Sequence, residues 1–168
     1  MITFRNAVGF LQTIADKHQV IRSFHSGFLD EVDISKLGVK DYPILYAEPS
    51  TTTVNKGTMT YSFNLYVLSV ISDVITESST NTFNSNQRTG RLDTLSSNLQ
   101  ILHDVINEFH QNLYSTSWVD DEVVLQLPIS CEPFTARFDN TLSGWSAPLV
   151  IEVNNTNNLC IVPITANT

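Results

Sequence analysis

The strongest constraint on the fold is one long run of regularly spaced leucines in the second half of the chain. Large apolar residues recur there at alternating steps of three and four, which is the period of one helical face. They are Leu92, Leu95, Leu99, Leu102, Ile106, Phe109 and Leu113, and the stripe is widened by Ile101 and Val105. The pattern predicts a helix of about 23 residues, roughly 35 Å long. Coiled coils share this spacing, but the flanks lack a ladder of glutamate and lysine, so a helix laid across a sheet is the preferred interpretation.

A second periodic segment predicts a long β-hairpin over residues 42–71. Large apolar residues alternate with polar ones from Thr58 to Val67, as in a strand with one buried face. Residues 55–57 (Asn-Lys-Gly) supply a turn, and two prolines mark the first strand as an edge or bulged strand. The second strand would extend for roughly 45 Å, about twice the usual strand length. We therefore expect the hairpin to project from its own domain and to touch a neighbouring molecule.

The other segments complete a domain of the α+β class. An amphipathic helix is predicted over residues 4–17, with Thr3 as its N-cap. A strand is expected over residues 20–25, and further apolar runs follow the long helix. These runs lie at residues 123–127, 134–138, 149–153 and 159–162. We therefore expect a single domain over residues 1–168, in which an antiparallel or mixed β-sheet with a long hairpin packs against an N-terminal helix and one long central helix.

Residues 76–91 interrupt these patterns with a polar stretch that contains one large apolar side chain, Phe83. This composition predicts a long, flexible surface loop. Two interpretations stay open. The segment is a tolerated insertion, or it becomes ordered on a partner with Phe83 and Arg88 as anchors.

Charge and composition narrow the range of functions. The chain has 17 acidic and 9 basic residues, a net charge of −8, and its polarity comes mainly from 17 Ser, 18 Thr and 15 Asn. The negative charge argues against a surface that grips phosphate backbones. No apolar run is long enough to span a membrane, and the first ten residues are typical of an amphipathic helix rather than a signal peptide. Cys131 and Cys160 lack metal-ligand spacing, and we expect both to be reduced.

Residue patterns that carry chemistry are missing. The sequence has no phosphate-binding loop, dinucleotide fingerprint, nucleophile elbow or zinc-protease motif. His103 and His110 lie about 10 Å apart along the predicted helix, too far to hold one zinc ion unaided. The acidic clusters at residues 30–33 and 120–122 are expected to be solvated edges, because adjacent strand residues point to opposite faces. We therefore predict no enzyme activity, no cofactor and no metal site.

The order of these elements resembles that of the tail terminator and neck-ring proteins of tailed bacteriophages. The shared order is a helix, a strand, a Tyr-Pro-Ile-Leu-Tyr strand, a long hairpin, a polar loop, a long leucine-rich helix and closing strands. The closing stretch is similar to small structural proteins of phages that infect Bacteroidetes, including the crAss-like group. The matching segments are 131–134 (Cys-Glu-Pro-Phe), 137–140 (Arg-Phe-Asp-Asn), Gly144-Trp145, 149–153 and 160–163.

The resemblance implies a structural protein of the virion, assembled in the host cytoplasm as a ring of six or twelve copies at the head–tail junction or tail end. Its implied partners are other neck, tail and portal proteins, and DNA passes through without specific binding; no membrane is involved. We expect the subunit interface to contain Tyr61, Phe63, Tyr66, Phe83, Arg88 and Arg91. We expect an acidic channel or edge formed by Asp120, Asp121 and Glu122. The long loop at residues 76–91 departs from the family pattern and leaves the place in the particle open.

Two other functions stay open at this stage. The first is a binding module of one or two copies, of the adhesion or carbohydrate-binding type, with an aromatic platform formed by Tyr61, Tyr66, Trp118 and Trp145. The second is a hydrolase with an unrecognised acidic site that includes Asp121 and Glu122.

Overall fold

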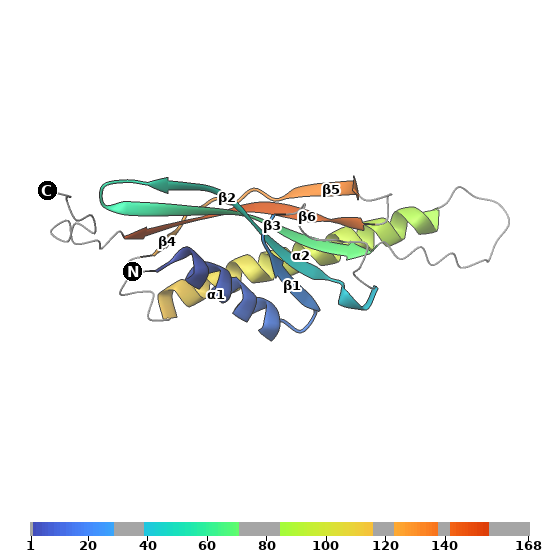
Figure 1. The fold of residues 1–168 in the computed structure, drawn as a ribbon. Coiled ribbons are helices and arrows are strands. Elements are labelled where there is room, and N and C mark those ends of the chain that lie inside the picture. Colours follow the sequence, from blue (N-terminus) through green and yellow to red (C-terminus); the bar gives the residue numbers. More distant parts are fainter. Residues whose placement is uncertain (1, 29–38, 71–84, 116–122, 138–141, 155–168) are drawn as a thin grey trace, which may run out of the picture.

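The protein has two layers, a six-stranded β-sheet and two helices that cover one of its faces (Figure 1). The computed structural model describes residues 2–28, 39–70, 85–115, 123–137 and 142–154. Among these, the strand order is β1-β2-β3-β6-β4, and β5 also pairs with β6. The pairing of β1 with β2 is parallel and the other pairings are antiparallel, so the sheet is mixed. The predicted α+β class is confirmed.

Helix α1 covers residues Phe4–Lys17, as predicted. The Thr3 hydroxyl accepts a hydrogen bond from the Asn6 backbone amide, and the Asn6 side chain accepts one from the Thr3 amide. This capping box satisfies two backbone groups at the start of the helix. The inward face of α1 consists of Ala7, Leu11, Ile14 and Ala15. A local sequence signal therefore sets both the start and the buried face of this helix.

The predicted hairpin consists of β2 (Ile44–Val54) and β3 (Thr58–Val70). Strand β3 pairs along its whole length with β6 (Leu142–Asn154), from Thr58 opposite Asn154 to Val70 opposite Leu142. The hairpin is therefore half embedded in the sheet, and it does not project as a separate arm. The part that stays exposed belongs to β2.

The edges of the sheet are short strands. On one side, β1 (Ser23–Ser26) pairs with the first four residues of β2. On the other, β5 (Glu132–Arg137) and β4 (Val124–Leu125) pair with different parts of β6. The close pairing of β3 with β6 depends on Gly144, because a Cβ atom there would clash with the Val67 carbonyl oxygen. A 3-10 turn at Val39–Asp41 leads into β2.

Helix α2 covers residues Ser85–Ser115 and has 31 residues, against about 23 expected. The loop prediction is therefore wrong for residues 85–91, which form the first turns of this helix. A stable helix propagates readily into polar sequence, because each added residue gains one hydrogen bond after nucleation. The predicted stripe is also displaced, since Leu92 and Leu99 are exposed and Asn98 is buried. The buried face of α2 consists of Asn98, Ile101, Leu102, Val105, Phe109 and Leu113.

The main core lies between the inner face of the sheet and the two helices. Alternate residues of the strands point into it, as the period of two requires. They are Leu45, Ala47, Tyr61, Phe63, Leu65, Val67, Ala147, Leu149, Ile151 and Val153. A smaller cluster on the outer face contains Ile44, Tyr46 and Leu68. The helices are therefore held on one face of the sheet by apolar burial, the main favourable term in folding.

Several expectations lie outside the described residues. They concern residues 30–33, 76–84 with Phe83, Trp118, the acidic cluster of Asp120, Asp121 and Glu122, Cys160 and the last expected strand at 159–162.

Candidate functional site

The most exposed regular element is the far half of β2 with the adjoining turn, residues 50–57, which we call the hairpin tip. Every residue in this segment is exposed, whereas residues 44–47 of the same strand are buried. Strand β1 pairs only with residues 44–47. Among the described residues, no strand covers the outer edge of Ser50–Val54, so its backbone groups on that side can pair with an added strand.

The composition of the hairpin tip explains why this edge stays soluble. Three consecutive threonines, Thr51–Thr53, favour an extended backbone without supplying large apolar surface. The register shifts between Pro49 and Thr52, where β2 contains one extra residue relative to β3. Bulges and edge prolines restrict uncontrolled pairing at a sheet edge. The tip is therefore an open edge with features that limit uncontrolled strand pairing. It has one large exposed apolar residue, Val54 (66% exposed), and one charged residue, Lys56.

Two of the predicted interface residues lie in the core of the subunit. Tyr61 and Phe63 are 3% and 1% exposed, and the Phe4 ring of α1 lies against both. The Tyr61 hydroxyl donates a hydrogen bond to the Ile2 carbonyl. The expectation that they face a neighbouring subunit is corrected, because α1 covers the face of the sheet to which they point.

Tyr66 lies on the opposite, outer face of β3 and is half-buried. Its hydroxyl donates a hydrogen bond to the Glu48 carboxylate at 2.9 Å, and its ring lies against Phe134 and Tyr46. Of the predicted interface side chains that the structure describes, Tyr66 alone reaches a surface. Arg88 and Arg91 lie in the first turns of α2.

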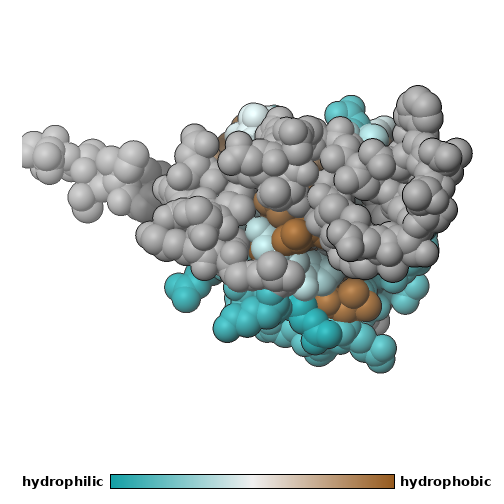
Figure 2. Space-filling view, turned by 90° about the vertical axis from the view of Figure 1, so that its right-hand side faces the viewer, coloured by the Kyte–Doolittle hydropathy of each residue, from teal (hydrophilic) through white to brown (hydrophobic). Residues whose placement is uncertain are grey.

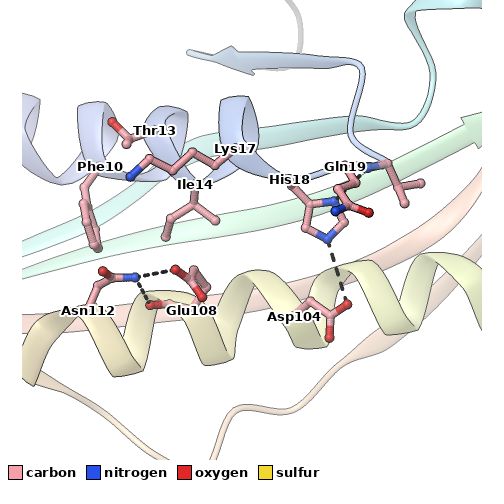
Figure 3. Close-up of a pocket in the computed structure, with 10 residues that line it drawn as sticks. Phe10, Thr13, Ile14, Lys17, His18, Gln19, Asp104, Glu108 and Asn112 are labelled. Atoms are coloured by element: carbon pink, nitrogen blue, oxygen red, sulfur yellow. Dashed lines mark hydrogen bonds and ion pairs between the residues drawn. The ribbon is translucent and has the colours of Figure 1, made fainter. Parts of the chain in front are cut away.

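A groove of about 450 Å³ lies between α1 and α2 (Figure 3). Its apolar lining residues are Phe10, Ile14 and Val20, of which Val20 is 44% exposed. Its acidic wall comes from α2, where Asp104 and Glu108 are one helical turn apart. The remaining lining residues are Thr13, Lys17, His18, Gln19 and Asn112. We call this feature the α1/α2 groove.

Hydrogen bonds fix the orientation of the groove side chains. His18 Nδ1 accepts from the backbone amides of Val20 and Ile21 at 3.2 and 3.4 Å, and Nε2 lies 3.9 Å from the Asp104 carboxylate. The same carboxylate accepts a hydrogen bond from Gln100 at 2.8 Å. The ring therefore joins the end of α1 to α2, with its second nitrogen directed at an acid.

The carboxylates of the acidic wall accept hydrogen bonds from neutral amides. The Glu108 carboxylate accepts a hydrogen bond from the Asn112 amide at 2.8 Å. Among the described side chains, no lysine or arginine lies within ion-pair distance of Asp104 or Glu108. Both carboxylates are thus held in place by neutral amides.

A second cavity, of about 420 Å³, lies near the start of β2 and the first half of α2. Its wall includes Asn98, whose amide nitrogen donates to the Ser143 carbonyl and whose oxygen accepts from the Ser69 hydroxyl. Tyr42 also lines it, and burial together with the nearby Asp41 charge raises the pKa of the Tyr42 phenol. The Asn98 hydrogen bonds join α2 to β3 and β6, so this cavity has a structural role in the contact between the layers.

The described residues supply little material for catalysis. They contain no group of three or more His, Cys, Asp or Glu that could hold a metal ion. His103 is largely exposed and contacts Asn107 and Asp104 on its own helix. Burial raises the pKa of the Cys131 thiol, which disfavours the reactive thiolate. No helix within the described ranges is long and apolar enough to cross a membrane.

The aromatic platform of the alternative binding module is not assembled among the residues described. Tyr61 is in the core, and Trp145 is on the inner face, where its indole nitrogen donates to the Leu95 carbonyl at 2.8 Å. At the end of the molecule where α2 begins, the visible described surface is mainly hydrophilic, with separate apolar side chains (Figure 2). This face shows no broad apolar platform outside the grey residues.

Comparison with known protein families finds no family that matches the chain, and no curated protein matches it either. The features of the molecule that bear on function are therefore its fold and the two surfaces described above, the hairpin tip and the α1/α2 groove.

Proposed function

We propose that this chain is a structural subunit of a ring in the virion of a tailed bacteriophage. The ring lies at the head–tail junction or at the tail end, helps to join tail to head, and lines the channel through which DNA passes. The proposal extends the sequence resemblance, and the single observation that supports it best is the hairpin tip, an exposed strand end with an open edge.

An open strand edge favours assembly of a particular kind. A peptide or strand from another chain can extend the sheet there through main-chain hydrogen bonds. When the edge of one copy binds a different surface of the next, the interface is heterologous, and repeated rotation closes a ring. The tip is polar, as expected for a contact that must stay soluble before assembly.

The charge of the chain is consistent with a channel wall. A net charge of −8 on each copy gives a ring whose field repels the phosphate backbone. DNA can then slide past without being held by ion pairs. Phosphate-gripping proteins have the opposite sign of charge.

The test is the mass of the protein in solution, measured by sedimentation equilibrium at concentrations up to about 100 µM. We expect six or twelve copies for the wild-type chain, in amounts that rise with concentration. A variant in which Thr51 and Thr53 are both changed to glutamate should be monomeric with an unchanged unfolding midpoint, because inserted charge blocks edge pairing. A matched variant with glutamate at Ser96 and Ser97, exposed positions on α2, should assemble as the wild type does. A wild-type chain that stays at one or two copies throughout would reject the ring.

A further inference from the structure

We propose that the α1/α2 groove is the docking site for the hairpin tip of a second copy of this chain. The inference depends on the proposed function, since a ring subunit must receive the tip of its neighbour somewhere. It adds which surface receives the tip and which side chains recognise it.

The groove is suited to a cationic group on an apolar stem. Phe10, Ile14 and Val20 give it an apolar lining, and α2 adds the carboxylates of Asp104 and Glu108. The side chain of lysine has this division, because its methylene stem packs on apolar surface while the ammonium group reaches polar partners. The groove volume of about 450 Å³ leaves room for a neighbouring apolar residue as well.

The electrostatics of the groove favour a positive charge. The end of α1 lies at the groove, and the last carbonyl groups of a helix carry partial negative charge. Two groups at the end of α1, Lys17 and His18, could oppose the binding of a cation. His18 uses Nδ1 to accept backbone hydrogen bonds, and Lys17 makes no ion pair with a described acidic side chain. The groove thus contains two carboxylates against one lysine, and no described lysine or arginine lies within ion-pair distance of either carboxylate.

The hairpin tip carries the complementary groups. Lys56 is the sole charged residue in the segment from Ser50 to Gly57 and lies at the turn. Val54 is two residues away and is 66% exposed, although apolar side chains of this size gain by burial. The turn is held by a hydrogen bond from the Asn55 amide to the Thr58 carbonyl at 2.9 Å. One cation and one exposed apolar side chain thus lie two residues apart at an ordered turn.

The tip of the same copy does not fill the groove. None of the residues that line the groove comes from the hairpin tip. Figure 1 shows the tip at one end of the molecule, away from the end of α1 where the groove lies. The pairing is therefore between different surfaces of two copies, and this is the heterologous arrangement that a ring requires.

Charge reversal tests the pairing. Lys56→Glu in the tip and Glu108→Lys in the groove should each weaken self-association by about tenfold or more, because an attractive contact becomes repulsive. Both side chains are exposed in the subunit, so unfolding midpoints should stay unchanged. The matched controls are Lys40→Glu and Asp93→Lys, which make the same charge changes at exposed positions outside the groove and the tip. These controls should associate as the wild type does.

Complementation then identifies the partners. An equal mixture of the Lys56→Glu and Glu108→Lys chains should recover assembly, in particles that contain both variants in equal amounts. A single chain that carries both reversals should also assemble. If the wild type assembles but neither reversal weakens it, or if the mixture fails to recover, the groove is not the docking site and the ring proposal stands. A wild-type chain that never assembles overturns both the docking site and the ring proposal.

Discussion

The two halves of strand β2 show how one strand serves two purposes. Residues 44–47 are buried and are paired on both sides, with β1 and with β3. Residues 50–54 are exposed, and those that pair, residues 52–54, pair only with β3 among the described strands. Residues 44–47 stabilise the fold, and residues 50–54 are available for contact with another molecule. Substitutions in the two halves should therefore separate stability from assembly.

The largest effect on stability is expected where β3 faces the helices. Phe63→Ala should lower the free energy of unfolding by about 3–5 kcal/mol, because it leaves a cavity under α1. Thr53→Ala in the hairpin tip is the contrasting change and should alter it by less than about 0.5 kcal/mol. Urea unfolding of both variants provides the comparison. Equal effects at the two positions would show that the tip is part of the folded core.

The next largest effect is expected where α2 contacts the last residues of β3 and the start of β6. Asn98→Ala should cost about 1–3 kcal/mol, because it leaves the Ser143 carbonyl and the Ser69 hydroxyl without this partner. Gln100→Ala, on the exposed side of the same helix, is the control and should cost little. Thermal unfolding measures both. If Asn98→Ala leaves the stability unchanged, water replaces the hydrogen bonds of the amide without loss of stability.

A smaller effect is expected at the start of α1, which supports the region of β3 opposite the tip. Thr3→Ala removes the capping box and should cost about 1 kcal/mol. Thr3→Ser keeps the hydroxyl and should preserve most of that stability. Because the Ile2 carbonyl accepts from Tyr61, which pairs with Thr52, amide exchange at Tyr61 should rise in the alanine variant alone.

The smallest effect is a pH dependence at the first half of the hairpin. Burial, and secondarily Asp41, raises the pKa of Tyr42 above its ordinary value of 10.0. The folded chain thus keeps this proton to a higher pH than the unfolded chain does. The resulting stability is complete below pH 10 and is lost as the pH rises through the raised pKa. In denaturant titrations at a series of pH values above 10, the stability of Tyr42→Phe should fall less steeply with pH than that of the wild type.

Local signals in the sequence predicted the elements, but long-range packing determined which faces they bury. Helix α1 was predicted with its cap because Thr3 and its apolar face lie within one short segment. On α2, Leu99 and Asn98 are adjacent, and the leucine pattern did not show that the asparagine would point inward to bond Ser143. Alternation along β3 marked Tyr61 and Phe63 as one face. That α1 would cover this face depends on contacts across about 60 residues of sequence.

The candidate site was predictable only in part. The hairpin tip follows from the turn at residues 55–57 and from the length of β3, both visible in the sequence. The α1/α2 groove joins Lys17 and His18 to Asp104 and Glu108, which are almost 90 residues away, and no local pattern indicates such a pairing. A carboxylate pair one turn apart on a helix is common on solvated surfaces. The pair becomes part of a groove only because α1 packs opposite it.

Hydrogen exchange at the hairpin tip tests the central claim most directly. The amides of Ser50–Val54 that point to the open edge should exchange rapidly in the Lys56→Glu variant, at a concentration where it is monomeric, and should be protected at least tenfold in the wild-type assembly. The amides of residues 44–47 should be protected equally in both, since their partners lie within the subunit. Protection confined to the assembled tip is the predicted result. Equal exchange of the tip in monomer and assembly would contradict the account.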